Sequence, residues 1–357
     1  MFRRLLSLSL CLALMGACAP CARADDLPPL AAHSFVLMNA DGRVLYGLRE
    51  EEALPMASTT KLMTALLVVE HCAPDEEVEI PADCCDVEGS SMYLRPGERY
   101  TVRELLCGLL LVSGNDAALA LARYAAGSET QFVAWMNEKA ASLGMKHSHF
   151  ANPHGLSAQG HCSSAADLGL LMAACLRSDA LMEIAGTRSV NVGEQTLYNH
   201  NKLLGRCPGC LGGKTGYTET AGRCLVSCCE REGTRLICVT LDDPNDWEDH
   251  CALYDWGFAA FSTREVTAAL SFEVPVVSGE TALVRVEAEP LRLFLPRAAQ
   301  VTAAAELPRF VFAPVNEGET AGVVRFLLGG EVVGESRLYY TETVQTQSRE
   351  GFWRRGI

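Results

Sequence analysis

A serine and a lysine three residues apart are the first candidates for chemistry in this chain. The run Ser58-Thr59-Thr60-Lys61 places a hydroxyl and an amine at positions i and i+3, which share one face if the segment is helical. A serine hydroxyl is a poor nucleophile at neutral pH, but a neutral amine beside it can take its proton during attack. Burial or a nearby cation would lower the lysine pKa enough for that role.

Two further motifs follow the first one along the chain. Ser113-Gly114-Asn115 comes about fifty residues later, and Lys214-Thr215-Gly216 about a hundred residues beyond that. Glycine among small polar residues predicts a break between two helices, and such a loop can aim Ser113 and Asn115 into a cleft. Two lysines near one serine repel each other, so one of them is more easily neutral.

The elements that must position these residues are visible as apolar patterns. A run from Leu62 to Val69 has few polar positions and predicts a buried helix, whose first turn would carry Ser58 and Lys61 at the edge of the core. Segments 102–124, 132–143 and 165–176 predict further helices, the first interrupted at the serine-glycine-asparagine motif. Segments 34–38 and 44–48, and later 224–229 and 236–241, predict two hairpins. The fold class is therefore α+β, with a largely helical insertion between the hairpins.

The organisation of the chain follows from changes in composition. We expect a signal peptide over residues 1–24, a main domain that carries the three motifs over 25–262, a small β-sandwich-like domain over 263–344 and a polar tail over 345–357. The β-domain is indicated by alternating runs such as Leu283-Val284-Arg285-Val286-Glu287. The tail ends in Phe352-Trp353-Arg354-Arg355-Gly356-Ile357, which offers at best a peripheral foothold on a membrane.

The first residues have the features of an export signal. Arg3 and Arg4 precede an apolar run from Leu5 to Met15, and Ala22-Arg23-Ala24 provides a cleavage site before Asp25. Lipid attachment at Cys18 is a minor alternative. The remaining chain would hold 27 basic and 44 acidic residues, a net charge of −17. Phosphate binding needs a basic surface, so this charge excludes nucleic acid as a partner.

Thirteen cysteines would remain after cleavage. Cys107, Cys175 and Cys238 lie in apolar stretches, where a packing role is the default. Cys207-Pro208-Gly209-Cys210 has metal-ligand spacing, but no second pair stands where a zinc site would need it. We expect a local disulfide or free thiols there, with no metal and no other cofactor.

The motifs and their order resemble the D-alanyl-D-alanine carboxypeptidases, which are low-molecular-weight penicillin-binding proteins. The resemblance covers roughly residues 32–261, and the β-domain after it matches the family's domain order. It includes three stretches besides the motifs, namely Asn152-Pro153-His154-Gly155-Leu156, Ser163-Ser164-Ala165-Ala166-Asp167-Leu168 and Asn199-His200-Asn201-Lys202-Leu203.

The resemblance implies an exported enzyme of the cell envelope that acts on peptidoglycan stem peptides and is inhibited by β-lactams. Ser58 would attack the carbonyl of the penultimate D-alanine and release the terminal D-alanine. Lys61 would be the base, and Ser113 would relay a proton. The residues expected to bind the substrate are Asn115 for its amide backbone, Lys214, Thr215 and Thr218 for its carboxylate, and Tyr217, whose backbone amide with that of Ser58 forms an oxyanion hole.

The sequence also departs from the family pattern. Relatives often carry an arginine roughly thirty residues after the lysine of the third motif, where this chain has Asp242-Asp243-Pro244-Asn245-Asp246. Two other functions remain open: a serine β-lactamase, although no Glu-x-x-Leu-Asn string occurs between Asp116 and Gly213, and a non-catalytic cell-wall binding or sensing protein. His154, Asp167, Asn199 and Asn201 are expected to be structural.

Overall fold

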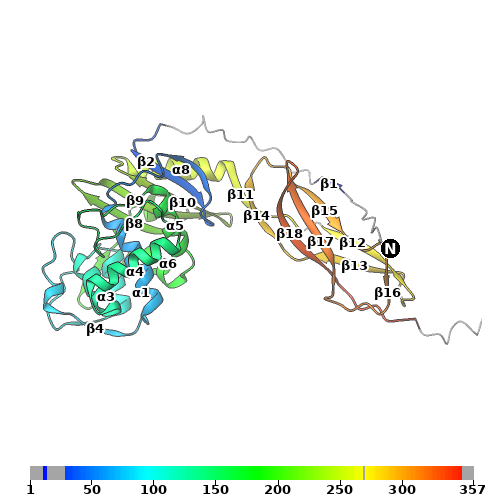
Figure 1. The fold of residues 1–357 in the computed structure, drawn as a ribbon, viewed down its shortest axis with the longest axis horizontal. Coiled ribbons are helices and arrows are strands. Elements are labelled where there is room, and N and C mark those ends of the chain that lie inside the picture. The colour runs from blue at the N-terminus through cyan, green and yellow to red at the C-terminus, as the bar shows by residue number, and fades with distance from the viewer. Residues whose placement is uncertain (1–10, 14–28, 268–269, 348–357) are drawn as a thin grey trace, which may run out of the picture. The chain divides into compact units, whose positions relative to one another are not determined.

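The structure is a computed structural model that describes residues 11–13, 29–267 and 270–347 (Figure 1). It divides into two compact units: in the described ranges, the first comprises residues 29–258, and the second comprises residues 259–267 and 270–347 together with residues 11–13. Each unit has its own hydrophobic core. Within the described ranges, no helix is long and apolar enough to cross a membrane.

An antiparallel five-stranded sheet forms the centre of the first unit, in the order β3-β2-β10-β9-β8. Both predicted hairpins are confirmed in this sheet, and the Lys214 motif lies within the edge strand β8. The strands are β2 (Ser34–Asn39), β3 (Val44–Leu48), β8 (Cys210–Thr218), β9 (Gly222–Arg231) and β10 (Thr234–Leu241).

Helices cover both faces of this sheet (Figure 1). Helix α5 (Ala165–Cys175) packs against β2, β9 and β10, and α8 (Asp246–Ala260) covers the opposite face. Neighbouring strand residues point to opposite faces, so Met38 contacts α5 while Leu37 contacts α8. A Cβ added at Gly169 would lie 2.5 Å from Met38 Sδ, and one at Gly257 would lie 2.7 Å from Leu37 Cδ2. Both helices therefore approach the sheet through a glycine.

A largely helical region lies between the hairpins, as predicted. The expected break is present between α2 (Val102–Leu110) and α3 (Asn115–Ala126). Thr101 begins α2 with a capping box shared with Glu104. The other elements are α1 (Lys61–His71), β4 (Glu77–Glu79), β5 (Arg99–Thr101), α4 (Glu129–Ser142), α6 (Asp179–Gly186), β6 (Ser189–Val192), β7 (Gln195–Tyr198) and α7 (Leu203–Arg206), with 3-10 helices at Ala57–Thr60 and Ala82–Cys84.

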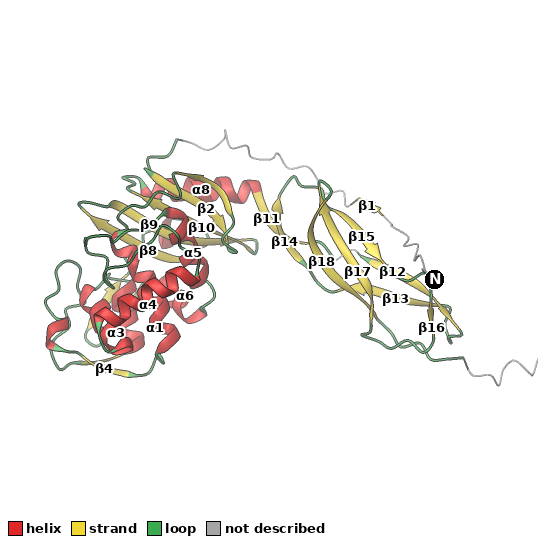
Figure 2. Cartoon of the chain, viewed as in Figure 1, coloured by secondary structure: helices red, strands yellow, loops and turns green. Residues whose placement is uncertain are grey.

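The second unit consists of strands and loops in its described part (Figure 2), which confirms the predicted all-β region. Its main sheet has the order β1-β15-β17-β18-β13-β12-β16, and β11 pairs with β14. Strand β1 (Cys11–Ala13) falls in the segment predicted as a signal peptide; the rest of that segment and residues 348–357 of the predicted tail lie outside the described residues. The other strands are β11 (Phe261–Glu265), β12 (Ser271–Val277), β13 (Leu283–Ala288), β14 (Arg292–Pro296), β15 (Thr302–Glu306), β16 (Val311–Phe312), β17 (Thr320–Leu328) and β18 (Glu331–Tyr340).

Candidate active site

Ser58 and Lys61 meet at the start of α1. Ser58 lies in the 3-10 helix Ala57–Thr60, and Lys61 is the first residue of α1. Lys61 Nζ lies 2.9 Å from Ser58 Oγ, which is the contact that their spacing predicts. Ser58 is half-buried and lines an open pocket, whereas Lys61 is fully buried behind it. The hydroxyl is therefore accessible to a ligand, and the amine beside it is shielded from water.

The surroundings of Lys61 favour the neutral amine. Nζ has two acceptors in addition to Ser58, namely Asn115 Oδ1 and the His154 carbonyl oxygen, each at 2.6 Å. A neutral amine has two N–H donors for these oxygens, which leaves its lone pair facing the Ser58 hydroxyl. Burial lowers the pKa of Lys61 well below its usual 10.5, and the charge of Lys214 lowers it further, while Asp116 opposes both. This arrangement suits a general base.

The second motif lies between α2 and α3. Ser113 has a φ of 63° and lines the same pocket as Ser58. No hydrogen bond joins Ser113 to either lysine among the described residues. Both ends of the Asn115 amide have a protein partner, because Oδ1 accepts from Lys61 and Nδ2 donates to the Glu88 carbonyl oxygen at 2.5 Å. The predicted contact of Asn115 with a substrate amide stays a prediction; the contact present is with the base.

Asp116 fixes a loop that the sequence analysis did not assign to the site. Its carboxylate is 1% exposed and accepts hydrogen bonds from Ser91 Oγ at 2.6 Å, from Met92 N at 2.9 Å and from Leu94 N at 3.1 Å. The neighbouring Ser90 lines the pocket and accepts from Asn115 N at 2.8 Å. Several main-chain N–H groups converging on one buried carboxylate hold a loop rigidly. The loop therefore forms one wall of the pocket.

The third motif lies on β8 against the 3-10 helix. A Cβ added at Gly216 would lie 3.0 Å from Ser58 N, so glycine at this position suits the close passage of the strand beside the serine. Thr215 and Tyr217 line the pocket. Lys214 does not line it: the side chain is buried, and Nζ donates to the Thr215 carbonyl oxygen at 2.8 Å. Burial lowers the pKa of Lys214 from 10.5 to about 7.

Thr218 lies outside the set of residues that line the Ser58 pocket. It lines a separate pocket of about 80 Å³ together with Ala57 and Gly155. Its hydroxyl accepts a hydrogen bond from Ala221 N at 3.0 Å in the turn between β8 and β9. Side chains alternate between the two faces of a strand, so Thr218 does not share the face of Thr215 and Tyr217. It is also the last residue of β8, where the chain enters the turn to β9.

The stretch around His154 supplies a main-chain oxygen to the site. Asn152 Oδ1 accepts from Gly155 N at 2.7 Å and thereby closes a tight turn. This turn aims the His154 carbonyl oxygen at Lys61 Nζ. Burial, followed by the charge of Lys61, lowers the pKa of the His154 ring to about 4. The backbone of His154 rather than its ring thus contacts the base, in line with a structural interpretation.

The other polar residues expected to be structural support backbone groups. Asp167 Oδ2 accepts from His147 N and Ser148 Oγ, both at 2.7 Å, while Ser164 caps α5. Asn199 Nδ2 donates to the Ala185 carbonyl oxygen at 3.1 Å and to the Thr187 carbonyl oxygen at 2.9 Å. These bonds satisfy backbone groups in the loops beside α5 and α6.

The cysteines that follow residue 28 are free in the structure. Cys207 Sγ lies 3.7 Å from Cys229 Sγ on β9, a proximity between distant residues that their sequence spacing could not reveal. In the described ranges, no three histidine, cysteine or acidic side chains gather closely enough to hold a metal ion.

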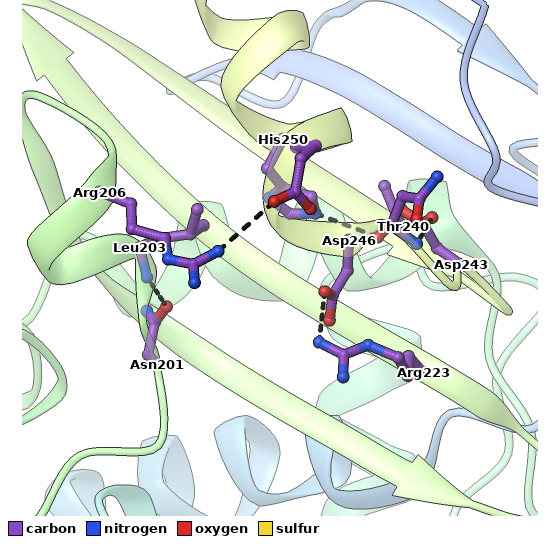
Figure 3. Close-up of polar contacts among 10 residues, drawn as sticks. Asn201, Leu203, Arg206, Arg223, Thr240, Asp243, Asp246 and His250 are labelled. Atoms are coloured by element: carbon purple, nitrogen blue, oxygen red, sulfur yellow. Dashed lines mark hydrogen bonds and ion pairs between the residues drawn. The ribbon is translucent and has the colours of Figure 1, made fainter.

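The pocket in front of Ser58 has a volume of about 470 Å³. Three residues on its far wall were missed by the sequence analysis: Arg223 from β9, and Asp246 and Trp247 from α8. Arg223 Nη2 donates to Asp246 Oδ1 at 2.5 Å (Figure 3). The position of Arg223 opposite Tyr217 in the β8–β9 hairpin was available in principle from the turn at residues 219–221.

Comparison with known proteins identifies the family of this arrangement. A family model described as D-alanyl-D-alanine carboxypeptidase matches residues 22–245. The D-alanyl-D-alanine carboxypeptidase DacF of Bacillus subtilis is 33% identical over 328 residues, which cover 85% of this chain and 84% of the relative. DacB2 of Mycobacterium tuberculosis, of the same description, is 37% identical over 248 residues, covering 65% of this chain and 84% of the relative.

A solved structure agrees with these relatives. The crystal structure of penicillin binding protein 5 from Haemophilus influenzae aligns with a TM-score of 0.69 at 29% identity, covering 89% of this chain and 98% of the other. The fold, the paired serine and lysine, and the sequence relatives all point the same way. This chain belongs to the D-alanyl-D-alanine carboxypeptidase family.

Proposed function

We propose that this protein is a serine-type D-Ala-D-Ala carboxypeptidase that removes the terminal D-alanine from peptidoglycan stem pentapeptides. The observation that carries the proposal is the contact of Ser58 Oγ with the buried amine of Lys61 at the edge of an open pocket. A binding protein has no use for a buried amine of lowered pKa beside an exposed hydroxyl. An acyl-transfer enzyme needs both.

The first half of the reaction forms an acyl-enzyme. Lys61 Nζ takes the Ser58 proton as Oγ attacks the carbonyl carbon of the penultimate D-alanine. The N–H groups of Ser58 and Tyr217 stabilise the oxyanion, a role supported by the close passage of β8 at Gly216. Collapse of the intermediate breaks the peptide bond, and the leaving nitrogen takes a proton that Ser113 relays from the lysine side.

The second half of the reaction restores the serine. Water attacks the ester carbon, the Ser58 oxygen leaves and recovers its proton, and the shortened stem peptide departs. Asn115 would align the peptide backbone, and Thr215 would donate to the terminal carboxylate. Lys214 would support the site through its charge, which lowers the pKa of Lys61, from a buried position rather than from the pocket surface. We assign Thr218 a role in shaping the hairpin turn that follows the motif.

The same site explains an expected sensitivity to β-lactams, whose carbonyl acylates the same serine. We also propose that the enzyme works outside the cytoplasm, in the cell envelope, where its substrate is found. A peripheral contact of the C-terminal tail with the membrane rests on the sequence alone, since the tail's apolar residues lie outside the described ranges.

Release of D-alanine from a purified stem pentapeptide tests the proposal. We expect stoichiometric D-alanine and tetrapeptide from the wild-type protein, and no release from Ser58→Ala. The peptide ending in L-alanine serves as the control substrate and should remain intact. No release from any D-Ala-D-Ala stem peptide would refute the proposal and favour the binding or sensing alternative.

A fluorescent penicillin separates the carboxypeptidase from a serine β-lactamase. Slow deacylation leaves a covalent label on the protein through gel electrophoresis, which is the result we expect. Fast turnover of the penicillin, with little label and with product accumulating, would favour the β-lactamase.

A further inference from the structure

The far wall of the Ser58 pocket presents a guanidinium group. Arg223 stands directly opposite Tyr217 in the β8–β9 pairing, so the two side chains share one face of the sheet. Thr215 lies two residues from Tyr217 and therefore on that same face. Residues one step diagonal across a strand pair are about 7–8 Å apart, which a long side chain can span. Arg223 and Thr215 can thus contact one ligand group.

The acidic residue beside Arg223 orients the guanidinium rather than hiding it. Arg223 Nη2 donates to Asp246 Oδ1 at 2.5 Å (Figure 3). The Trp247 ring centroid lies 5.4 Å from the guanidinium carbon. The Asp246 side chain is 3% exposed, whereas that of Arg223 is 40% exposed. The pair therefore presents nitrogen donors to the pocket beside a carboxylate that is itself almost fully buried.

The donor capacity of Arg223 is not used up by this ion pair. A guanidinium has five N–H donors in a planar fork that matches a carboxylate. Asp246 engages Nη2, and Nε is a buried nitrogen with no hydrogen-bond partner among the described residues. An unsatisfied buried donor is costly. A carboxylate ligand that draws the guanidinium edge toward the pocket would satisfy it.

Other cations near Ser58 are less suited to bind an anion. Lys61 and Lys214 are buried and do not line the pocket. Lys202 lines the pocket but is exposed and has a flexible stem, and a strongly hydrated ammonium on such a stem gives little orientation. Arg223 is held by the nearly buried Asp246 and offers its donors as a planar fork.

We propose that Arg223, oriented by Asp246 and Trp247, binds the terminal carboxylate of the substrate together with Thr215. This assignment rests on the proposed carboxypeptidase function and names the cation that selects peptides with a free C-terminus. The proposed cation lies on β9, in the wall of the Ser58 pocket that Asp246 also lines. In the sequence, only the acidic residues of segment 242–246 were noticed in place of the family's arginine.

A pair of peptides tests the assignment, one ending in D-Ala-D-Ala with a free carboxylate and the other with a C-terminal amide. The quantity measured is kcat/KM for cleavage of the last peptide bond by the wild type and by Arg223→Ala. A hydrogen bond to a charged group is lost only with the acid, so we expect a fall of about 10–100-fold for the acid and less than about threefold for the amide. A merely structural role would lower both alike.

Two further variants sharpen the test. Arg223→Lys keeps the charge without the fork, and we expect it to recover only part of the preference for the acid. Arg206→Ala is the matched control. Arg206 pairs at 3.4 Å with Glu248, which lies on α8 as Asp246 does, but Arg206 does not line the pocket. Its removal should leave the preference for the free acid over the amide unchanged. The thermal unfolding midpoint of each variant verifies folding.

The outcomes separate this inference from the proposed function. If the wild type cleaves the acid and Arg223→Ala retains the full preference for it, the inference is wrong and the carboxypeptidase function stands. If Lys202→Ala, rather than Arg223→Ala, abolishes the preference, the carboxylate belongs to Lys202. If the wild type cleaves neither peptide, the proposed function fails and this inference falls with it.

Discussion

Asn115 Oδ1 lies 2.6 Å from Lys61 Nζ, so the second motif holds the base of the first. The amide is itself fixed by its Nδ2 donation to the Glu88 carbonyl oxygen. Lys61 is thereby confined between Asn115, Ser58 and His154, with little freedom to swing away from the hydroxyl. A base that is held in place before the substrate arrives needs little reorganisation during proton transfer.

Asn115→Asp should raise the pKa of Lys61. A negative charge at 2.6 Å favours the protonated amine, which cannot accept the Ser58 proton. The acid limb of the pH profile for acylation should therefore move to higher pH, and the rate near pH 7 should fall about tenfold or more. Stopped-flow acylation by a chromogenic β-lactam measures this limb. Asn115→Leu, which adds no charge, is the control, and an upward shift in that variant would contradict the explanation.

Lys214→Gln should also move the acid limb of acylation upward. The charge of Lys214 is the second cause, after burial, that lowers the pKa of Lys61. Removing that charge raises the Lys61 pKa, so the neutral base forms only at higher pH. Thr215→Val is the comparison, because it alters the pocket without altering charge and should lower the rate at an unchanged midpoint. Identical midpoints in the wild type and Lys214→Gln would show that the two lysines are not coupled.

Gly155→Ala should disturb the nucleophile. Gly155 has a φ of 93°, and an added Cβ would overlap the Ala57 carbonyl oxygen and lie 2.9 Å from Ser58 N. We expect acylation to slow by about tenfold or more, since displacement of a reacting group by about an ångström is costly. Gly144→Ala is the control that separates backbone strain from steric overlap. Gly144 also has a positive φ, of 76°, but an added Cβ would meet no atom within 4 Å. That control should cost roughly 1–2 kcal/mol of stability and leave acylation intact.

His250 should make the first unit sensitive to acid. Its ring lies 3.2 Å from Thr240 Oγ1 (Figure 3) and 2.8 Å from Ser227 Oγ. Burial lowers its pKa from 6.5 to about 3. The unfolded chain therefore binds a proton at His250 more readily than the folded chain does. The contribution of the neutral ring to the free energy of unfolding is fully present above about pH 6.5 and is lost as the pH falls toward 3.

Chemical denaturation at several pH values measures this contribution. The difference in unfolding free energy between the wild type and His250→Gln should be largest at pH 7 and should shrink steadily toward pH 4. A constant difference over that range would mean that the ring does not titrate as its burial requires.

The sequence was sufficient where local pattern and chemistry agree. The spacing of Ser58 and Lys61 determines their contact, because a helical turn brings positions i and i+3 together. The break at Ser113 follows from glycine among polar residues, and the hairpins follow from alternation. The chain's family resemblance rested on these same residues.

The sequence was not sufficient to predict the parts of the site that depend on strand register and on packing between elements distant in the chain. Arg223 reaches the pocket only because β9 pairs with β8 so that it stands opposite Tyr217. Helix α8 was not predicted, because its covered face holds polar residues such as His250 and Tyr254 that bond to Ser227 rather than an apolar stripe. Thr218 sits in the motif by sequence, yet the end of β8 turns it away from the pocket.

The measurement that tests the account most directly is the position of the covalent bond formed with a β-lactam. Purified protein is treated with benzylpenicillin, quenched and digested with trypsin, and the peptides are sequenced by mass spectrometry. We predict one adduct of the intact antibiotic, on Ser58 within the peptide that spans residues 50–61, and none in Ser58→Ala. An adduct on any other residue, or a normal adduct in Ser58→Ala, would contradict the account.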